Sequence, residues 1–172
     1  MLAIQFIKSN CDATAVQVEA SITAAHNVLD YWENSGSLPE MHSLPTILIE
    51  RNGQEVSRLE YDKVTQAALT NYLASYRETQ LMPSQPNPIT VGTGVQITVT
   101  AKIFDWQDNP VPTDITPLTF VVTSPGGSQA STTVTPTNGQ ATLTLSLNTT
   151  GQYTVATDVV NWQNDSITVQ GV

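Results

Sequence analysis

The strongest nucleophile in this sequence is a single cysteine, Cys11, in the stretch "IKSNCDAT". A predicted strand ends just before it and a predicted helix follows, so the partial positive charge of a helix N-terminus would favour the thiolate. The neighbouring carboxylate of Asp12 opposes that charge state, and a second cysteine that could resolve a mixed disulfide is missing. Cys11 is therefore a candidate thiol, with a small half-buried structural residue as the alternative, and we expect no catalytic residue.

Metal and cofactor chemistry finds little support in the side-chain spacing. His26 and His42 lack the short Cys/His spacing of structural zinc sites. Asp105, Asp108 and Asp114 surround a proline-rich loop, where carboxylate oxygens could offer ligands to calcium. The sequence contains no Ser-His-Asp arrangement and no glycine loop that would hold a phosphate. We expect neither a metal nor a cofactor.

Two tryptophans are candidates for a surface contact. Trp106 lies in "DWQDNP" and Trp162 in "NWQND", and these polar neighbours predict exposure. A tryptophan at a loop tip can anchor a sugar or a protein partner. The alternative, which we favour, is that each ring folds over the end of its own domain.

Charge and hydropathy exclude several partners. The 172 residues carry a formal charge of −9, and the basic residues form no stripe that could neutralise phosphates. We therefore expect no nucleic acid and no polybasic membrane contact. No stretch approaches the roughly 20 apolar residues of a membrane span. The N-terminal "MLAIQFIKSNCDAT" lacks a basic leader, so we expect synthesis in the cytoplasm without a signal peptide.

A proline-rich stretch divides the chain. "LMPSQPNPIT" begins at residue 81 and places three prolines within six residues, a pattern that forbids helix and favours an extended spacer. We predict a first domain over 1–80, a linker over 81–88 and a second domain over 89–172.

The first domain is predicted to be a small α/β fold. Residues 2–7 read as a buried strand, and a helical stripe runs from Ala15 through Val18 to Trp32. Residues 45–60 form two β-rich runs joined by Asn52-Gly53, a strong hairpin signal. A last helix follows Asp62, which can cap it. The predicted order is strand, helix, hairpin, helix.

The second domain is predicted to be all β. Apolar residues alternate and turn residues punctuate the strands, which indicates a β-sandwich of about seven strands. The predicted strands cover 95–103, 118–122, 130–135, 140–147, 152–160 and 166–170.

This half resembles an immunoglobulin-like domain of the bacterial invasin/intimin type. The resemblance rests on "VQITVTAKIFDWQDNPVP", "TNGQATLTL" and "TTGQYTV". It implies a sandwich without a disulfide, in which Tyr153 forms a tyrosine corner through its hydroxyl. Such domains serve as spacers, stalks, adhesins and virion ornaments.

The first half resembles an abridged thioredoxin-like fold. "LPTILIERNGQEVSRLE" is similar to the family segment in which a proline, often cis, opens a hairpin before the final helix. The resemblance implies that Pro45 is a possible cis-proline. The chain departs from the family at the redox motif, since Thr14 replaces the second cysteine of Cys-x-x-Cys.

Together the two halves resemble a virion accessory protein of a tailed bacteriophage. We expect a non-enzymatic structural component, located in the virion, that docks through residues 1–80 and holds the Ig-like domain outward. Head decoration is favoured over a tail protein. The expected partners are other capsid or tail proteins, in multiple copies per particle. The alternatives are a cell-surface adhesion or carbohydrate-binding module that contacts host-surface glycans, and a monothiol redox adaptor that uses Cys11.

Overall fold

The computed structural model describes residues 2–7, 16–19, 46–60, 66–92 and 94–172, and the chain divides into two compact units. The first unit is Met1–Tyr76 with Trp106–Asp108, and the second is Arg77–Asp105 with Asn109–Val172. The second unit thus begins before the predicted linker at 81–88. Within the described ranges, no helix has the length and hydropathy needed to cross a bilayer.

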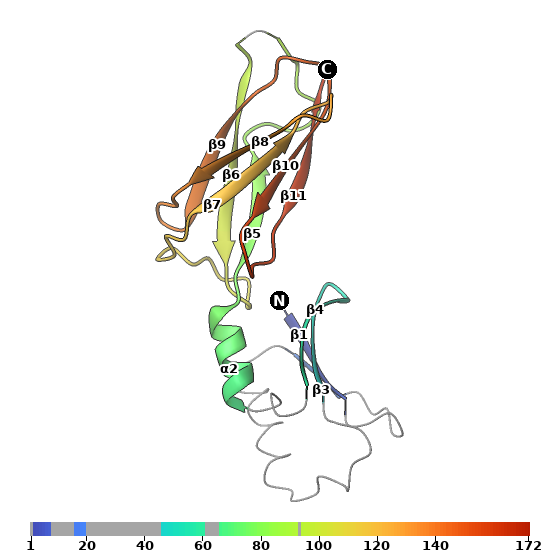
Figure 1. The fold of residues 1–172 in the computed structure, drawn as a ribbon, viewed down its shortest axis with the longest axis vertical. Coiled ribbons are helices and arrows are strands. Elements are labelled where there is room, and N and C mark those ends of the chain that lie inside the picture. Colours follow the sequence, from blue (N-terminus) through green and yellow to red (C-terminus); the bar gives the residue numbers. More distant parts are fainter. Residues whose placement is uncertain (1, 8–15, 20–45, 61–65, 93) are drawn as a thin grey trace, which may run out of the picture. The chain divides into compact units, whose positions relative to one another are not determined.

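The described part of the first unit contains an antiparallel sheet with the strand order β2-β1-β3-β4 (Figure 1). Asn52 and Gly53 join β3 to β4 with φ values of 53° and 76°. Positive φ at both central residues is the geometry of a two-residue hairpin turn, so the predicted hairpin is confirmed. The strands are β1 (Leu2–Ile7), β2 (Val16–Glu19), β3 (Thr46–Arg51) and β4 (Gln54–Glu60).

The described part of the first unit also contains one short helix, and the first residues of another predicted helix form a strand instead. The last predicted helix is observed as α2 (Gln66–Ser75), in which Leu69 and Leu73 are buried. Val16–Glu19, predicted as the start of the first helix, instead forms β2 and pairs with β1. The alternation of β-branched valines with polar residues in "VQVE" fits a strand better than a helix. The predicted helix over 20–32 and the Asp62 cap lie outside the described residues.

The second unit is a β-sandwich of two antiparallel sheets, as predicted (Figure 1). One sheet has the order β5-β6-β9 and the other the order β11-β10-β7-β8. The strands are β5 (Glu78–Pro83), β6 (Gln96–Phe104), β7 (Leu118–Thr123), β8 (Gln129–Val134), β9 (Gln140–Ser146), β10 (Gly151–Asp158) and β11 (Ser166–Gly171).

Strand β5 occupies residues that the sequence assigns partly to the linker. Its register with β6 runs from Glu78 opposite Phe104 to Pro83 opposite Val99. Pro83 lacks an N–H, but it ends an edge strand, where the missing donor costs no ladder hydrogen bond. Residues 81–83 are therefore part of a sheet and not of a spacer.

Packing between the two sheets holds the sandwich together without a disulfide. Phe120, Leu118 and Val155 are completely buried. Burying one such large apolar side chain contributes about 1.5–3 kcal/mol, comparable with the 2–5 kcal/mol typical of a native disulfide. The core comprises Leu81, Ile89, Ile97, Val99, Ala101, Ile103, Leu118, Phe120, Ala141, Leu143, Leu145, Leu147, Tyr153, Val155 and Val169.

The tyrosine corner is present. The Tyr153 hydroxyl donates a hydrogen bond to the carbonyl of Thr149 at 3.0 Å and accepts one from the Thr149 N–H at 3.1 Å. Its ring is buried in the core, with 4% of the residue exposed. One side chain thus satisfies both backbone groups of Thr149 in the turn before β10.

Candidate functional site

Among the residues whose side chains the structure describes, three polar ones are buried, and all lie in the sandwich: Glu78, Thr79 and Thr157. Glu78 and Thr79 begin β5, whereas Thr157 is near the end of β10, in the opposite sheet. The hydroxyl oxygens of Thr79 and Thr157 lie 2.6 Å apart, so a hydrogen bond joins the two sheets. This pair is the centre of a polar cluster in the second unit.

Asp165 completes this cluster from the turn before β11. Its N–H donates to the hydroxyl oxygens of Thr79 and Thr157, at 3.1 and 3.0 Å. Its carboxylate accepts hydrogen bonds from the N–H of Leu81 at 2.7 Å and of Ser166 at 2.8 Å. We call Thr79, Thr157 and Asp165 the interstrand clamp, because together they connect β5, β10 and β11.

The chemistry available to the interstrand clamp is limited by these partners. A threonine becomes a nucleophile when an adjacent base takes its proton. The Asp165 carboxylate is instead directed at two backbone N–H groups, and each threonine hydroxyl contacts the other and the Asp165 N–H. The arrangement therefore suits a structural role, holding the ends of three strands together.

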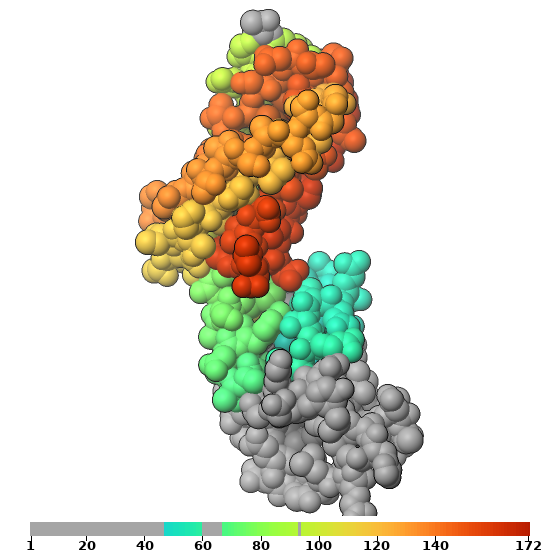
Figure 2. All heavy atoms as spheres, viewed as in Figure 1, coloured from blue at the N-terminus to red at the C-terminus, as the bar shows by residue number. Residues whose placement is uncertain are grey.

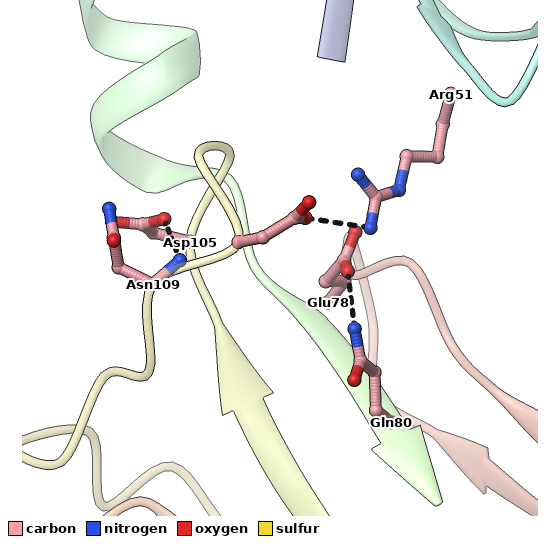
Figure 3. Close-up of polar contacts among 6 residues, drawn as sticks. Arg51, Glu78, Gln80, Asp105 and Asn109 are labelled. Carbon is pink, nitrogen blue, oxygen red and sulfur yellow. Dashed lines mark hydrogen bonds and ion pairs between the residues drawn. The ribbon is translucent and has the colours of Figure 1, made fainter. Parts of the chain in front are cut away.

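Further polar contacts lie near the ends of the strands (Figure 3). Gln80 donates to the Glu78 carboxylate at 3.4 Å. Asn109 donates its backbone N–H to Asp105 at 2.9 Å and its side-chain amide to the same carboxylate at 3.3 Å. Each of these contacts joins residues only two or four positions apart in the sequence.

The pKa of the Asp114 carboxyl differs from its ordinary value. Burial would raise the pKa of its carboxyl, but hydrogen bonds from Thr116 and the Arg77 guanidinium outweigh that effect and hold the pKa below its ordinary value. The Thr116 N–H lies 3.0 Å from one carboxylate oxygen, and Arg77 Nε lies 2.9 Å from the other. The ion pair ties the loop before β7 to the residue that precedes β5.

The three aspartates considered for calcium do not converge on one site. Asp105 accepts from Asn109, Asp114 pairs with Arg77, and Asp108 forms a 2.8 Å ion pair with Arg51 within the first unit. Across the described residues, no group of three or more His, Cys, Asp or Glu side chains is arranged to hold a metal ion.

The remaining predicted site residues differ in whether the structure describes them and in how far they are buried. Cys11 and Pro45 lie outside the described residues. Trp106 is 4% exposed and groups with the first unit, so the exposure predicted from its polar neighbours is wrong. Trp162 is half-buried and packs against the core of its own sandwich. The favoured interpretation, in which the ring folds over its own domain, is thereby supported for Trp162.

No pattern in the sequence predicted the interstrand clamp. Thr79 and Thr157 are separated by 78 residues, and Leu81 and Asp165 by 84. Threonine and aspartate are common in edge strands and turns, so their types alone do not mark a buried cluster. A pairing of β5 with the sandwich, had it been predicted, would have placed Thr79 near Asp165.

Comparison with known proteins gives only distant structural similarity. The sequence matches no protein-family model and no curated protein sequence. A beta-glycosidase from Bacteroides vulgatus aligns over 98% of this chain with 12% identity and a TM-score of 0.44. A glycosyl hydrolase family 2 member from Bacteroides cellulosilyticus aligns over 99% with 10% identity and a TM-score of 0.46. Salmonella alpha-2-macroglobulin aligns over 100% with 15% identity and a TM-score of 0.45.

The chain spans a small part of these proteins. The alignments cover 21% of each glycosidase chain and 11% of the macroglobulin chain.

Proposed function

We propose that this chain is a non-enzymatic structural component of a phage virion. Residues 1–80 dock on the particle, and the Ig-like sandwich is displayed from it, with head decoration favoured over the tail. The first domain is taken to be an abridged thioredoxin-like fold that provides shape for docking. The partners are capsid or tail proteins, and many copies occupy equivalent positions.

The strongest support for this proposal is that the buried polar side chains of the sandwich are hydrogen-bonded within the fold. Within the described residues, no buried side-chain nitrogen or oxygen lacks a hydrogen-bond partner. Thr79, Thr157 and Asp165 bind one another and nearby backbone groups. Enzyme active sites commonly contain polar groups whose hydrogen bonds are completed only by the substrate. The polar groups of this cluster instead make their hydrogen bonds within the fold. Such a domain can contact its partners through a stable surface and through the edge strands of its sheets.

The lack of a disulfide is consistent with the same role. The chain has one cysteine, and the sandwich relies on its core, the tyrosine corner and the interstrand clamp. A module of this kind keeps its structure both in the reducing cytosol, where virions assemble, and outside the cell after lysis.

Binding of the full-length chain to particles that lack it tests this function. We expect added protein to co-sediment with such particles and to saturate at a fixed number of copies per particle. A Cys11→Ser variant should bind equally well, because docking depends on shape and apolar contact and not on thiol chemistry. An unrelated bacterial Ig-like protein should remain in the supernatant.

Two outcomes would count against the proposal. Failure of the wild-type chain to co-sediment would remove the virion role, and a glycan array bound by the full-length chain would then favour the adhesion alternative. Binding that the Cys11→Ser variant loses would favour a thiol-dependent adaptor.

A further inference from the structure

The four edge strands of the sandwich differ in how their outer backbone groups are satisfied. On β5, the Thr79 N–H donates to the Gln163 carbonyl at 3.0 Å, and the Leu81 N–H donates to Asp165 at 2.7 Å. The next outward position is Pro83, which has no N–H. The outer edge of β5 therefore offers no free donor from 79 to 83.

The edge at β11 is closed in a similar way. The Asn87 side chain accepts from the Gln170 N–H at 3.0 Å and donates to the Thr168 carbonyl at 2.7 Å. The Ile89 N–H donates to the Gln170 carbonyl at 2.8 Å, and the Val172 N–H donates to the Ile89 carbonyl at 2.9 Å. The segment after β5 thus covers β11, and one side of the sandwich is sealed.

Strand β8 lies at the opposite edge of its sheet and is open. The Ser124 N–H donates to the Ser128 carbonyl, and the same register continues along the pairing of β7 with β8. Antiparallel pairs alternate between hydrogen-bonded and non-hydrogen-bonded positions, so the backbone groups of Gln129, Ser131 and Thr133 point outward from β7. Because β8 is the last strand in the order of its sheet, no strand is hydrogen-bonded to it on that side.

None of the usual protections of a sheet edge is present on β8. Natural edge strands are blunted by charges, prolines, bulges or a covering segment. β8 has the sequence QASTTV, and its pairing with β7 is regular through all six positions. Five of its six residues are exposed, so both faces of the strand are accessible. In Figure 2, the orange part of the chain that contains β8 lies on the visible surface of the sandwich.

Strand β9 is the other open edge, but its surroundings differ. Its residues alternate between exposed and buried, because Ala141, Leu143 and Leu145 pack in the core. On β8, Ala130 and Thr132 share the core-facing side with the partly buried Val134, yet both are exposed. Both faces of β8 are therefore accessible to solvent at these positions.

The charge pattern favours a second copy of this chain as the added strand. The whole chain carries −9, so most surfaces of two copies repel each other. No charged residue occurs between Asp114 and Asp158, a stretch that contains β7, β8 and β9. β8 can therefore approach its own copy without opposing like charges.

The side chains of β8 are also self-complementary. In an antiparallel pair centred on Ser131, Gln129 of one copy lies opposite Thr133 of the other, and Ser131 lies opposite Ser131. Gln129 already donates to the Thr123 hydroxyl at 3.2 Å, and Thr133 lies 3.1 Å from the Thr119 hydroxyl, both across the β7–β8 pair. The same kinds of contact would form between two copies.

We propose that β8 is a homotypic association edge, at which two copies pair antiparallel about a two-fold axis through Ser131. The two four-stranded sheets then join into one continuous sheet. A six-residue edge is much smaller than a standard interface of roughly 1,600 Å², so the association is weak in free solution. It becomes effective where copies are held close together, whatever holds them.

Sedimentation equilibrium of the full-length chain, from micromolar to low millimolar concentration, tests this inference. We expect a monomer–dimer equilibrium that Ser131→Lys weakens about tenfold or more, because two lysines then face each other across the axis. Thr144→Lys adds the same charge to the open edge of β9 and should leave the equilibrium unchanged. Circular dichroism and thermal unfolding check that both variants remain folded.

Cross-linking keeps the test decisive if Ser131→Lys unfolds. In a Cys11→Ser background, Ser131→Cys places two thiols opposite each other, where the Cα separation of about 5.5 Å suits a disulfide. A mild thiol oxidant should convert this variant to a covalent dimer far faster than the matched Thr144→Cys variant.

The results that would overturn the inference are equally definite. One is a wild-type chain that stays monomeric at low millimolar concentration. Another is a dimer that Ser131→Lys leaves intact or that Thr144→Lys disrupts to the same extent. Equal cross-linking rates for the two cysteine variants would also exclude the β8 pairing.

Discussion

At the scale of single residues, Tyr153 combines burial with two hydrogen bonds to one turn. Replacing it with phenylalanine keeps the ring in the core and removes the hydroxyl, which leaves the N–H and C=O of Thr149 without these partners. Tyr153→Phe should therefore lower the free energy of unfolding of the sandwich by about 1–3 kcal/mol. Native-state hydrogen exchange of amides in β6 and β10 measures this quantity for the sandwich itself.

A neighbouring substitution provides the control for this prediction. Gln152→Ala changes an exposed side chain in the same strand and should shift the free energy by no more than about 0.5 kcal/mol. Equal effects of the two substitutions would mean that the hydroxyl contributes nothing to the turn.

The lowered pKa of Asp114 leads to a second prediction at the scale of single residues. A carboxyl whose pKa is lower in the folded state stabilises the fold above its unfolded-state pKa, near the ordinary value of 3.8, and loses that contribution as the pH falls through the folded-state pKa. Asp114→Asn should therefore be destabilising at pH 7 and much less so at strongly acidic pH. Urea unfolding at several pH values measures the difference.

The matched control for Asp114 is Asp158→Asn, which changes an exposed carboxylate at the end of β10. If Asp114→Asn is as destabilising at low pH as at pH 7, the ion pair with Arg77 is not the source of its effect.

At the scale of elements, two glycines in equivalent turns differ in their surroundings. Gly53 and Gly139 have φ values of +76° and +67°, and each follows an asparagine. A Cβ at Gly53 meets nothing within 4 Å, whereas a Cβ at Gly139 would overlap the Val111 carbonyl oxygen. The turn at 138–139 thus requires glycine for space as well as for conformation.

Alanine substitutions separate these two requirements. Gly53→Ala should cost about 1–2 kcal/mol through left-handed strain alone. Gly139→Ala should cost clearly more, because backbone at Val111 must also move. Unfolding free energies from hydrogen exchange in each unit give both values, and equal losses would mean that the Val111 contact is readily relieved.

The interstrand clamp makes a prediction about coupling. Thr79→Val and Thr157→Val each remove one hydroxyl of the 2.6 Å pair. Because each residue is the other's partner, the losses should be non-additive by about 0.5–3 kcal/mol in a double-mutant cycle. The matched cycle on the exposed pair Thr100 and Thr142, 3.2 Å apart, should show a smaller coupling. Additive losses at the clamp would show that it does not act as a unit.

The same elements show what local sequence can and cannot predict. The alternation in β6, where Ile97, Val99, Ala101 and Ile103 are buried, is readable from the residues alone. β5 was missed because Pro83 ends it and further prolines follow, which makes the segment look like a linker. The contact of Asp165 with Leu81 spans 84 positions, and no local pattern encodes such a separation.

At the scale of the whole molecule, charge is distributed unevenly along the sandwich. Its charged residues lie at or near the end where β5 and β11 begin and where β6 and β10 finish, as Arg77, Glu78, Lys102, Asp105, Asp114, Asp158 and Asp165 show. The opposite end and the open β8 edge carry no charged side chain. The sandwich therefore has one charged end, one side that is sealed at β5 and β11, and two uncharged open edges, β8 and β9.

Imaging of the assembly that contains this chain tests the central claim most directly. Cryo-electron microscopy of purified virions should show the chain at many equivalent positions, with the sandwich projecting from a density that contains the first domain. A protein that remains a solitary particle in solution, and that leaves virion density unchanged when its gene is deleted, would contradict the account.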